Sequence, residues 1–288
     1  MNKEKIGLIG LGLVGTAVSE RLIGSGFQVL GYDVRAVGLD FVQFCSDPGE
    51  VFSLCDRIIL CLPTSQVVTD IVNESLPHFR SGQIVIDTGT GSPDEMVKIH
   101  DDLMGQGVTY LEATIAGSSD LLRNKQAPLF TAGDKDIIEG QGDLFRSLTE
   151  KSFYLGSFGN ASKFKLVHNL LIGLNRAVLA EGLQFAESLG FSSEESLSIL
   201  KQTTASSGVM KTKGDRMVKR DYEDPQAFLS QHIKDVKLIL EESERSGAIV
   251  PFSLLHKELL ESIESRGFGG VDNSAIMEAF SSDSLKGS

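Results

Sequence analysis

The chain has 288 residues, of which 41% are hydrophobic and 23% charged, so it can form one large or two medium domains with a buried core. Its formal net charge of −12 argues against nucleic acid or an anionic membrane surface as a partner. No stretch is long and apolar enough to span a membrane, and the opening MNKEKIGLIGLG lacks the length and cleavage site of a secretory signal. We therefore expect a cytoplasmic protein.

Neither the cysteines nor the histidines have the spacing of a metal site. Cys45, Cys55 and Cys61 are odd in number and form no CxxC, which is typical of reduced thiols. The five histidines are scattered, and each is better interpreted as a surface or packing residue than as a ligand. We expect no metal.

Residues 5–33 predict a strand, a glycine turn, a helix and a second strand. Gly10, Gly12 and Gly15 have the GxGxxG spacing, which combines a tight turn, close approach to a pyrophosphate and helix packing. A purely structural turn is the alternative, but the surrounding strand and helix favour a dinucleotide. The candidate contacts are Gly10, Leu11, Gly12, Leu13, Val14 and Gly15.

The acid at the end of the second strand bears on the choice of cofactor. A carboxylate at Asp33 can accept from both ribose hydroxyls of NAD and would repel the 2′-phosphate of NADP. Arg35 weakens this argument because a nearby guanidinium can bind that phosphate. The sequence therefore favours NAD and leaves NADP as the alternative.

Further apolar runs predict the rest of a largely parallel sheet: RIILCLP, QIVIDTGT, VTYLEATI, APLFTAG and finally SFYLG at residues 152–156. Leu62, Pro63 and Thr90 follow such strands, at the edge where a cofactor would bind. Simple turn chemistry is an equally good interpretation of these three residues when they are taken alone.

A long proline-free segment, from about residue 161 to 189, predicts a helix about 40 Å long at 1.5 Å per residue. Its centre is apolar nearly all round, so we expect burial on several sides and a role in joining two domains. Lys165 and Asn169 are four residues apart in its first turns and therefore share a face.

After Gly190 the pattern is helical to the end, with breaks at residues 203–208, 221–225 and 266–273. The expected organisation is a Rossmann-like α/β domain over residues 1–160 and an all-helical domain over residues 161–288. We expect the active site in the cleft between them.

Seven segments, in chain order, carry a family resemblance: GLIGLGLVG, CLPTSQVV, DTGTGSP, EATIAGS, KFKLVHN, IKD and GFGGVDNSAI. In these segments the chain resembles the β-hydroxyacid dehydrogenases, the family of 3-hydroxyisobutyrate dehydrogenase, tartronate semialdehyde reductase and glyoxylate/succinic semialdehyde reductase, whose fold is like that of 6-phosphogluconate dehydrogenase. The segments cover nearly the whole chain and occur in the family's order.

The resemblance implies a homodimer or homotetramer that transfers hydride between NAD or NADP and a small anionic hydroxy acid or semialdehyde. It places Thr90 beside the nicotinamide, Lys165 at the catalytic lysine and Asn169 at the substrate-positioning asparagine. It also implies that Lys234 reaches cofactor or substrate. The implied substrate residues at the end of the EATIAGS strand are Ala116, Gly117 and Ser118.

The departures from the family pattern concentrate in EATIAGS. Glu112 replaces an aspartate, Thr114 a proline, Ala116 a serine and Ser118 a glycine. One hydroxyl that would bind the substrate carboxylate is therefore missing at Ala116. This affects the identity of the substrate more than the reaction class.

The residues themselves support a hydride-transfer reaction, because the cofactor supplies the hydride and the protein must manage a proton. A partly desolvated lysine near another cation, as Lys165 would be near Lys234, can act as acid in reduction and base in oxidation. Simple charge neutralisation or snorkelling by Lys165 is the alternative. Arg123 and Lys125 can add positive potential, although an ordinary surface charge is the better interpretation of each.

Two other functions remain open. Imine reductases share the architecture but usually replace the catalytic lysine, which this chain keeps as Lys165. A catalytically silent, dinucleotide-binding scaffold is the other possibility, since some family members have lost the lysine and bind chromatin. The acidic charge and the retained lysine argue against it.

Overall fold

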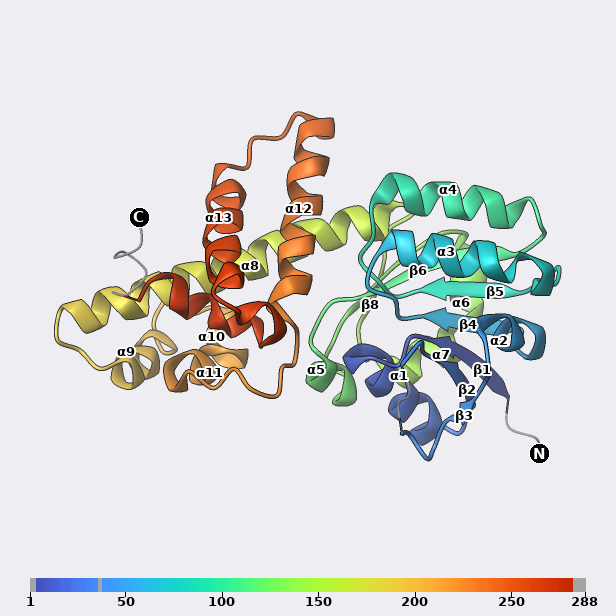
Figure 1. Ribbon diagram of the computed structural model, residues 1–288, viewed down its shortest axis with the longest axis horizontal. Helices are drawn as coiled ribbons and strands as arrows, with labels where there is room; N and C mark the ends of the chain where they lie inside the picture. The colour runs from blue at the N-terminus through green and yellow to red at the C-terminus, as the bar shows by residue number, and fades with distance from the viewer. Residues whose placement is uncertain (1–3, 36–37, 282–288) are drawn as a thin grey trace. The chain divides into compact units, whose positions relative to one another are not determined.

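A computed structural model of the protein describes residues 4–35 and 38–281. By its internal contacts the chain divides into two compact units, Met1–Lys165 and Leu166–Ser288. The division falls inside one helix, α8 (Asn160–Ser188). Figure 1 shows a sheet with its helices in the first unit and helices alone in the second.

The first unit contains one eight-stranded sheet with the order β3-β2-β1-β4-β5-β6-β7-β8. The six strands from β3 to β6 in that order are parallel, β7 is antiparallel to β6, and β8 is parallel to β7. The strands are β1 (Lys5–Ile9), β2 (Gln28–Tyr32), β3 (Gln43–Phe44), β4 (Arg57–Leu60), β5 (Ile84–Asp87), β6 (Thr109–Ile115), β7 (Leu129–Ala132) and β8 (Ser152–Tyr154). The carboxyl ends of the parallel strands therefore meet at one edge, and the chain reverses its strand order between β1 and β4.

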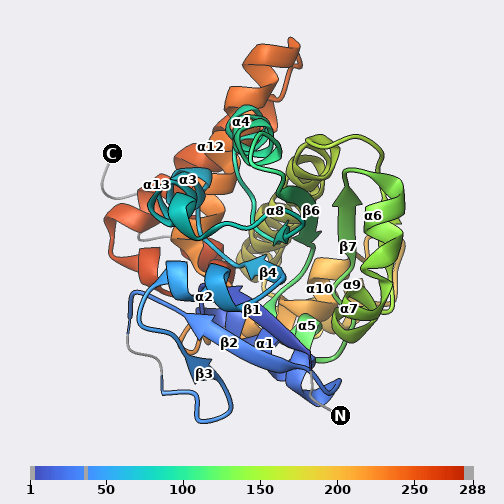
Figure 2. The same cartoon turned by 90° about the vertical axis from the view of Figure 1, so that its right-hand side faces the viewer.

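Helices cover both faces of this sheet, as Figure 2 shows. Alternation along the strands sends Ile6 and Leu8 of β1 into one core and Ile9 into the other. The first core is closed by α1 (Leu13–Gly24), α5 (Ser119–Arg123), α6 (Lys135–Gly140) and α7 (Gly142–Leu148). The second is closed by α2 (Pro48–Leu54), α3 (Ser65–Ser75) and α4 (Pro93–Met104), and the short η1 (Leu76–His78) follows α3. The predicted Rossmann-like α/β fold of this part of the chain is confirmed.

The second unit is helical, as predicted. Its elements after α8 are α9 (Ser193–Leu200), α10 (Gly208–Thr212), α11 (Gly214–Lys219), α12 (Leu229–Ser246), α13 (Pro251–Ser265), η2 (Phe268–Gly270) and η3 (Asn273–Ala279). Sequence reasoning missed the break between α12 and α13. There Gly247 ends α12 in the left-handed conformation and Pro251 starts α13, a pair of signals that the sequence does contain.

The expectation that α8 is buried on several sides is wrong for the single chain. One face, which includes Leu166, Leu179 and Leu183, is buried. The apolar side chains on the opposite face are each more than half exposed: Val167, Leu171, Val178 and Phe185. Leu189, directly after the helix, is exposed as well. An apolar composition all round the helix predicted burial, but the described residues 4–35 and 38–281 cover only one side of it.

Within the described residues, no helix is long and apolar enough to cross a membrane. Over the same ranges, no three His, Cys, Asp or Glu side chains are grouped so that they could hold a metal ion. Cys45, Cys55 and Cys61 are all free. Burial raises the pKa of the Cys61 thiol to about 12, so this side chain, which lies beside the glycine turn, is neutral.

Candidate functional site

Packing explains two of the three glycines in the turn after β1. Gly10 has a φ of +93°, and a Cβ there would lie 2.4 Å from the carbonyl oxygen of Cys61. A Cβ on Gly15 would lie 1.9 Å from the carbonyl oxygen of Gly10. Both positions therefore require glycine for the fold itself.

Gly12 is different, because its own chain leaves room beside it. A Cβ there would meet nothing nearer than Arg35 Nη2, at 3.5 Å. Gly12 is also the N-cap of α1, with no side-chain cap and no acidic residue in the first turn, which Leu13 and Val14 begin. Open N–H groups at a helix start attract anions, and the missing side chain lets a ligand approach the backbone. These features fit the pyrophosphate of a dinucleotide.

Asp33 lies directly after β2 and holds the glycine turn. Its Oδ2 accepts from the Leu11 N–H at 2.7 Å, and its Oδ1 accepts from the Arg35 N–H at 2.9 Å. The Arg35 side chain is exposed, with Nε 3.4 Å from Asp33 Oδ1. Asp33 thus has a structural task in addition to the ribose contact predicted for it, and Arg35 is placed next to it.

The other predicted cofactor residues lie at the same edge of the sheet. Leu62 and Pro63 follow β4, and Thr90 follows β5; Pro63 is exposed and the other two are partly exposed. The Cys61 N–H donates to Ile9 O at 2.8 Å, which fixes the start of this loop against the glycine turn.

The predicted substrate segment follows β6. Ala116 is only 4% exposed and packs with Phe130, Ala132 and Ala161. Ser118 is the N-cap of α5, where its Oγ accepts from the Leu121 N–H at 3.3 Å. Of the three candidates in this segment, Gly117 and Ser118 are partly exposed and Ala116 is buried.

Lys165 lies in the second turn of α8 and is 7% exposed. Its Nζ donates to the carbonyl oxygen of Ile115, the last residue of β6, at 2.6 Å. The ammonium is therefore held at the carboxyl edge of the sheet, the edge that carries the glycine turn.

Glu112 is a residue of this region to which the sequence assigned no role. It is fully buried in β6 and accepts from the N–H groups of Gly159, Ala161 and Ser162 and from the Ser162 hydroxyl. Burial raises the pKa of Glu112 above its ordinary value, and these donors act in the opposite direction. The carboxylate thereby caps the start of α8.

In the helical unit, Asp235 joins two predicted site residues. Asn169 Nδ2 donates to Asp235 Oδ2 at 2.8 Å, and Lys234 Nζ lies 3.0 Å from Asp235 Oδ1. Sequence reasoning noted the IKD segment but missed this connection, because residues 169 and 235 are distant in the chain. The carboxylate offsets much of the Lys234 charge and fixes which side of the Asn169 amide carries nitrogen.

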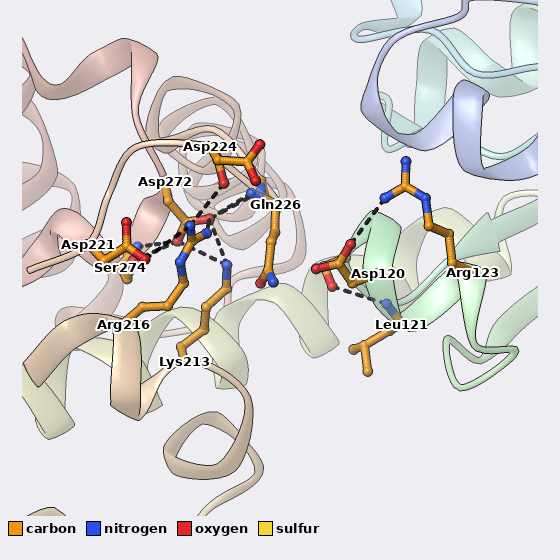
Figure 3. A network of polar contacts seen from close by, with 12 residues as sticks. Asp120, Leu121, Arg123, Lys213, Arg216, Asp221, Asp224, Gln226, Asp272 and Ser274 are labelled. Atoms are coloured by element: carbon orange, nitrogen blue, oxygen red, sulfur yellow. Dashed lines mark hydrogen bonds and ion pairs between the residues drawn. The ribbon is translucent and has the colours of Figure 1, made fainter. Parts of the chain in front are cut away.

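Figure 3 shows two further polar groups, each within its own unit. Arg123 pairs with Glu20 and Asp120, and Lys125 donates to a backbone carbonyl, so both behave as ordinary structural charges. Asp272, in the closing motif, is fully buried and pairs with Lys213 and Arg216.

Asp272 also accepts from its own segment and from the loop before α12. The donors are the backbone N–H groups of Gln226, Ala227 and Ser274 and the Ser274 hydroxyl. Burial raises the pKa of Asp272, but Lys213 and the two Ser274 donors outweigh this effect and hold it at about 2. The closing motif therefore anchors the loop that precedes the helix carrying Lys234.

The structure thus gathers the predicted residues in two sets. The glycine turn, Asp33, the loops after β4 to β6 and Lys165 share one edge of the sheet. Asn169 and Lys234 meet through Asp235 in the second unit, and Asn169 follows Lys165 by one turn of α8.

The parallel sheet, the glycine turn and the open helix start define a dinucleotide-binding protein of the Rossmann class. Two family profiles match the chain. "NAD binding domain of 6-phosphogluconate dehydrogenase" covers residues 5–156, and "NAD-binding of NADP-dependent 3-hydroxyisobutyrate dehydrogenase" covers residues 159–280. The chain belongs to the β-hydroxyacid dehydrogenase family, that of 3-hydroxyisobutyrate dehydrogenase.

Individual relatives agree with this assignment. Glyoxylate/succinic semialdehyde reductase 1 of Arabidopsis thaliana is 30% identical over 96% of this chain and 98% of its own length. The human cytokine-like nuclear factor N-PAC is 27% identical over 96% of this chain, which spans 51% of that longer protein. A 3-hydroxyisobutyrate dehydrogenase from Salmonella typhimurium has the same fold, with a TM-score of 0.88 at 17% identity and coverage of 96% and 99% of the two chains.

Proposed function

We propose that the protein is an NAD(P)-dependent oxidoreductase that interconverts a small 3-hydroxy acid and its semialdehyde, with Lys165 as the general acid and base. One observation carries the proposal. The buried Lys165 ammonium is held at Ile115 O, on the sheet edge where the glycine turn is shaped for a dinucleotide. A buried lysine at a cofactor edge is suited to proton transfer beside the reacting carbon.

The protein's part of the reaction is the transfer of a proton. A dinucleotide held at the glycine turn of Gly10, Gly12 and Gly15 would supply or take the hydride at the substrate carbon. In reduction, Lys165 donates a proton from Nζ to the aldehyde oxygen as the C–O double bond becomes a C–OH group. In oxidation the same amine takes the hydroxyl proton back, so protons and electrons balance in both directions.

Asn169 and Lys234 are proposed to bind the substrate's polar end. Asp235 accepts one Asn169 N–H, and this leaves the amide oriented, with its carbonyl on the opposite side. Lys234 contributes a positive charge that Asp235 partly offsets. Such a site suits one carboxylate and a neutral aldehyde or hydroxyl better than a substrate of higher negative charge.

The test is Lys165→Ala, with Lys163→Ala as the matched control. Lys163 lies on the same helix but is exposed. We expect Lys165→Ala to lower kcat by at least about 100-fold, the usual worth of a general acid or base, and to leave the Kd for cofactor within about threefold. Lys163→Ala should behave as wild type. Near-normal turnover by Lys165→Ala would refute the assignment.

A substrate panel separates the alternatives. Nicotinamide absorbance followed with semialdehydes, hydroxy acids and cyclic imines should show turnover with an acid or semialdehyde. Turnover of cyclic imines alone would instead identify an imine reductase. Cofactor binding without turnover of any compound would identify a silent scaffold.

We propose NAD as the preferred cofactor, because the Asp33 carboxylate at the end of β2 disfavours the 2′-phosphate of NADP. Arg35 is the structural argument for NADP, since its exposed guanidinium lies beside that carboxylate. The ratio of kcat/KM for the two reduced cofactors decides between them. Arg35→Ala should weaken NADPH binding more than NADH binding.

We also propose that the protein acts in the cytoplasm as a homodimer or homotetramer. The exposed apolar side chains on α8, including Leu171 and Val178, support an interface with a second copy. Leu171→Glu should shift the mass measured by light scattering to that of a smaller species. A wild-type protein whose mass by light scattering is already that of a monomer would contradict the proposal.

A further inference from the structure

We propose that Glu112 is the positioning residue for Lys165: its buried carboxylate fixes the first turn of α8 and so sets where the Lys165 ammonium lies. The inference rests on the proposed role of Lys165. In this proposal Glu112 does not contact the substrate, because both oxygens of its carboxylate accept hydrogen bonds from the start of α8.

The contacts of Glu112 are saturated and all come from one turn of the chain. Oε2 accepts from the N–H groups of Gly159 at 2.7 Å and Ala161 at 3.2 Å. Oε1 accepts from the N–H group of Ser162 at 3.0 Å and from the Ser162 hydroxyl. Because the first N–H groups of a helix have no partner within the helix, this carboxylate satisfies donors that would otherwise be orphaned inside the protein.

Strand β6 therefore holds α8 at two points. Glu112 binds the helix start, and the carbonyl of Ile115 accepts from Lys165 Nζ at 2.6 Å. Glu112 and Ile115 are three residues apart on the strand, as Ser162 and Lys165 are on the helix. A shift of the first helical turn away from Glu112 would move Nζ off the Ile115 carbonyl.

A carboxylate is the side chain that suits this position. Glutamine has the same size but replaces one accepting oxygen with a donating NH₂ group. Whichever way the amide turns, it faces either the Gly159 and Ala161 N–H groups or the Ser162 N–H and hydroxyl. One pair of donors then loses its acceptor in a buried place, and the helix start must move or fray.

Glu112→Gln is accordingly the first test. We expect kcat to fall on the order of 10–100-fold, because small displacements of a catalytic group are costly, with the Kd for cofactor changed by less than about threefold. Glu112→Asp keeps both accepting oxygens and should retain more activity than Glu112→Gln. A loss of thermal stability with normal kcat in the folded fraction would show a purely structural cap and overturn the proposal.

A second readout does not depend on catalysis. Lys165 and Lys163 are acylated in the ligand-free protein with an amine-reactive acetylating reagent, and their rates are compared by mass spectrometry. Glu112→Gln should raise the Lys165 rate several-fold relative to the exposed Lys163 on the same helix. An unchanged ratio in folded protein overturns the positioning role.

The two readouts separate the two proposals. If Lys165→Ala turns over normally, the proposed function fails, while the acylation ratio still decides the role of Glu112. If Glu112→Gln does not fold, Ser162→Ala is the substitute, because it removes only the hydroxyl donor. It should raise the acylation rate of Lys165, by less than the several-fold expected for Glu112→Gln. An unchanged acylation rate of Lys165 in Ser162→Ala refutes the proposal. Asp134→Asn, the same exchange of a carboxylate for an amide at the exposed cap of α6, is the matched control and should alter neither readout.

Discussion

The glycine turn allows a sharp separation of fold from ligand binding, because Gly12→Ala and Gly15→Ala add the same methyl group to different surroundings. At Gly12 the added Cβ would lie 3.5 Å from Arg35 Nη2, the end of a flexible, exposed side chain. We expect the free energy of unfolding to change by no more than about 0.5 kcal/mol. At Gly15 the Cβ would lie 1.9 Å from a backbone oxygen.

No backbone atom can tolerate that approach, so α1 must shift and Gly15→Ala should cost about 1–3 kcal/mol of stability or more. The affinity for the cofactor should depend on the other glycine, Gly12. Gly12→Ala fills the space through which a pyrophosphate would approach, and we expect the Kd for NAD or NADP to rise at least about tenfold, or about 1.4 kcal/mol.

Denaturant unfolding and titration calorimetry measure the two quantities on the same variants. The result that refutes the reasoning is Gly12→Ala that binds both cofactors as wild type does. Unchanged stability of Gly15→Ala would refute the packing argument separately.

Two predictions concern the helical unit. Burial, with Arg176 nearby, lowers the pKa of His256 from 6.5 to about 4, so the unfolded chain takes up this proton first as pH falls. Protonation of His256 alone should therefore lower the free energy of unfolding by about 2 kcal/mol between about pH 7 and about pH 5. His256→Gln should reduce this pH dependence in denaturant unfolding, and the neighbouring His232, whose pKa burial also lowers, should keep part of it. Equal slopes for wild type and His256→Gln would contradict the prediction. Asp235→Ala removes the acceptor of Asn169 and the partner of Lys234, and should raise KM for the acid on the order of tenfold, with Glu241→Ala on the exposed side of α12 as control. Steady-state kinetics with an unchanged KM would show that Asp235 does not organise the substrate site.

Local patterns were sufficient to predict most of the architecture. The strands lie where apolar runs are bounded by turn residues, and α8 spans Asn160–Ser188, close to the predicted 161–189. These features depend on neighbours in the chain, and periodicity reports them directly. The two-residue strand β3 was missed, since it contains too few residues to show an alternation.

The burial of α8 could not be predicted in the same way. Composition shows which side chains are apolar, but whether they are buried depends on the rest of the chain. In the described part of the chain, Leu171 and Val178 remain more than half exposed. The supporting carboxylates were missed for a related reason. Glu112 meets its donors 47 to 50 residues later and Asp235 meets Asn169 across 66 residues, separations at which no spacing rule applies.

The structure explains the altered residue Ala116 in the EATIAGS segment and indicates which neighbour could contact a substrate. Ala116 is buried against Ala161, the second residue of α8, so its methyl group belongs to the packing between strand and helix. The N–H of Ala116 already donates to Pro128 O at 2.8 Å.

Ser118 accepts a cap hydrogen bond through Oγ but keeps its own hydroxyl proton as a donor. A substrate carboxylate at this strand end would therefore be met by Ser118 in place of the missing hydroxyl at Ala116. Ser118→Ala should raise KM for the acid, whereas Ala116→Ser should strain the start of α8 without lowering that KM.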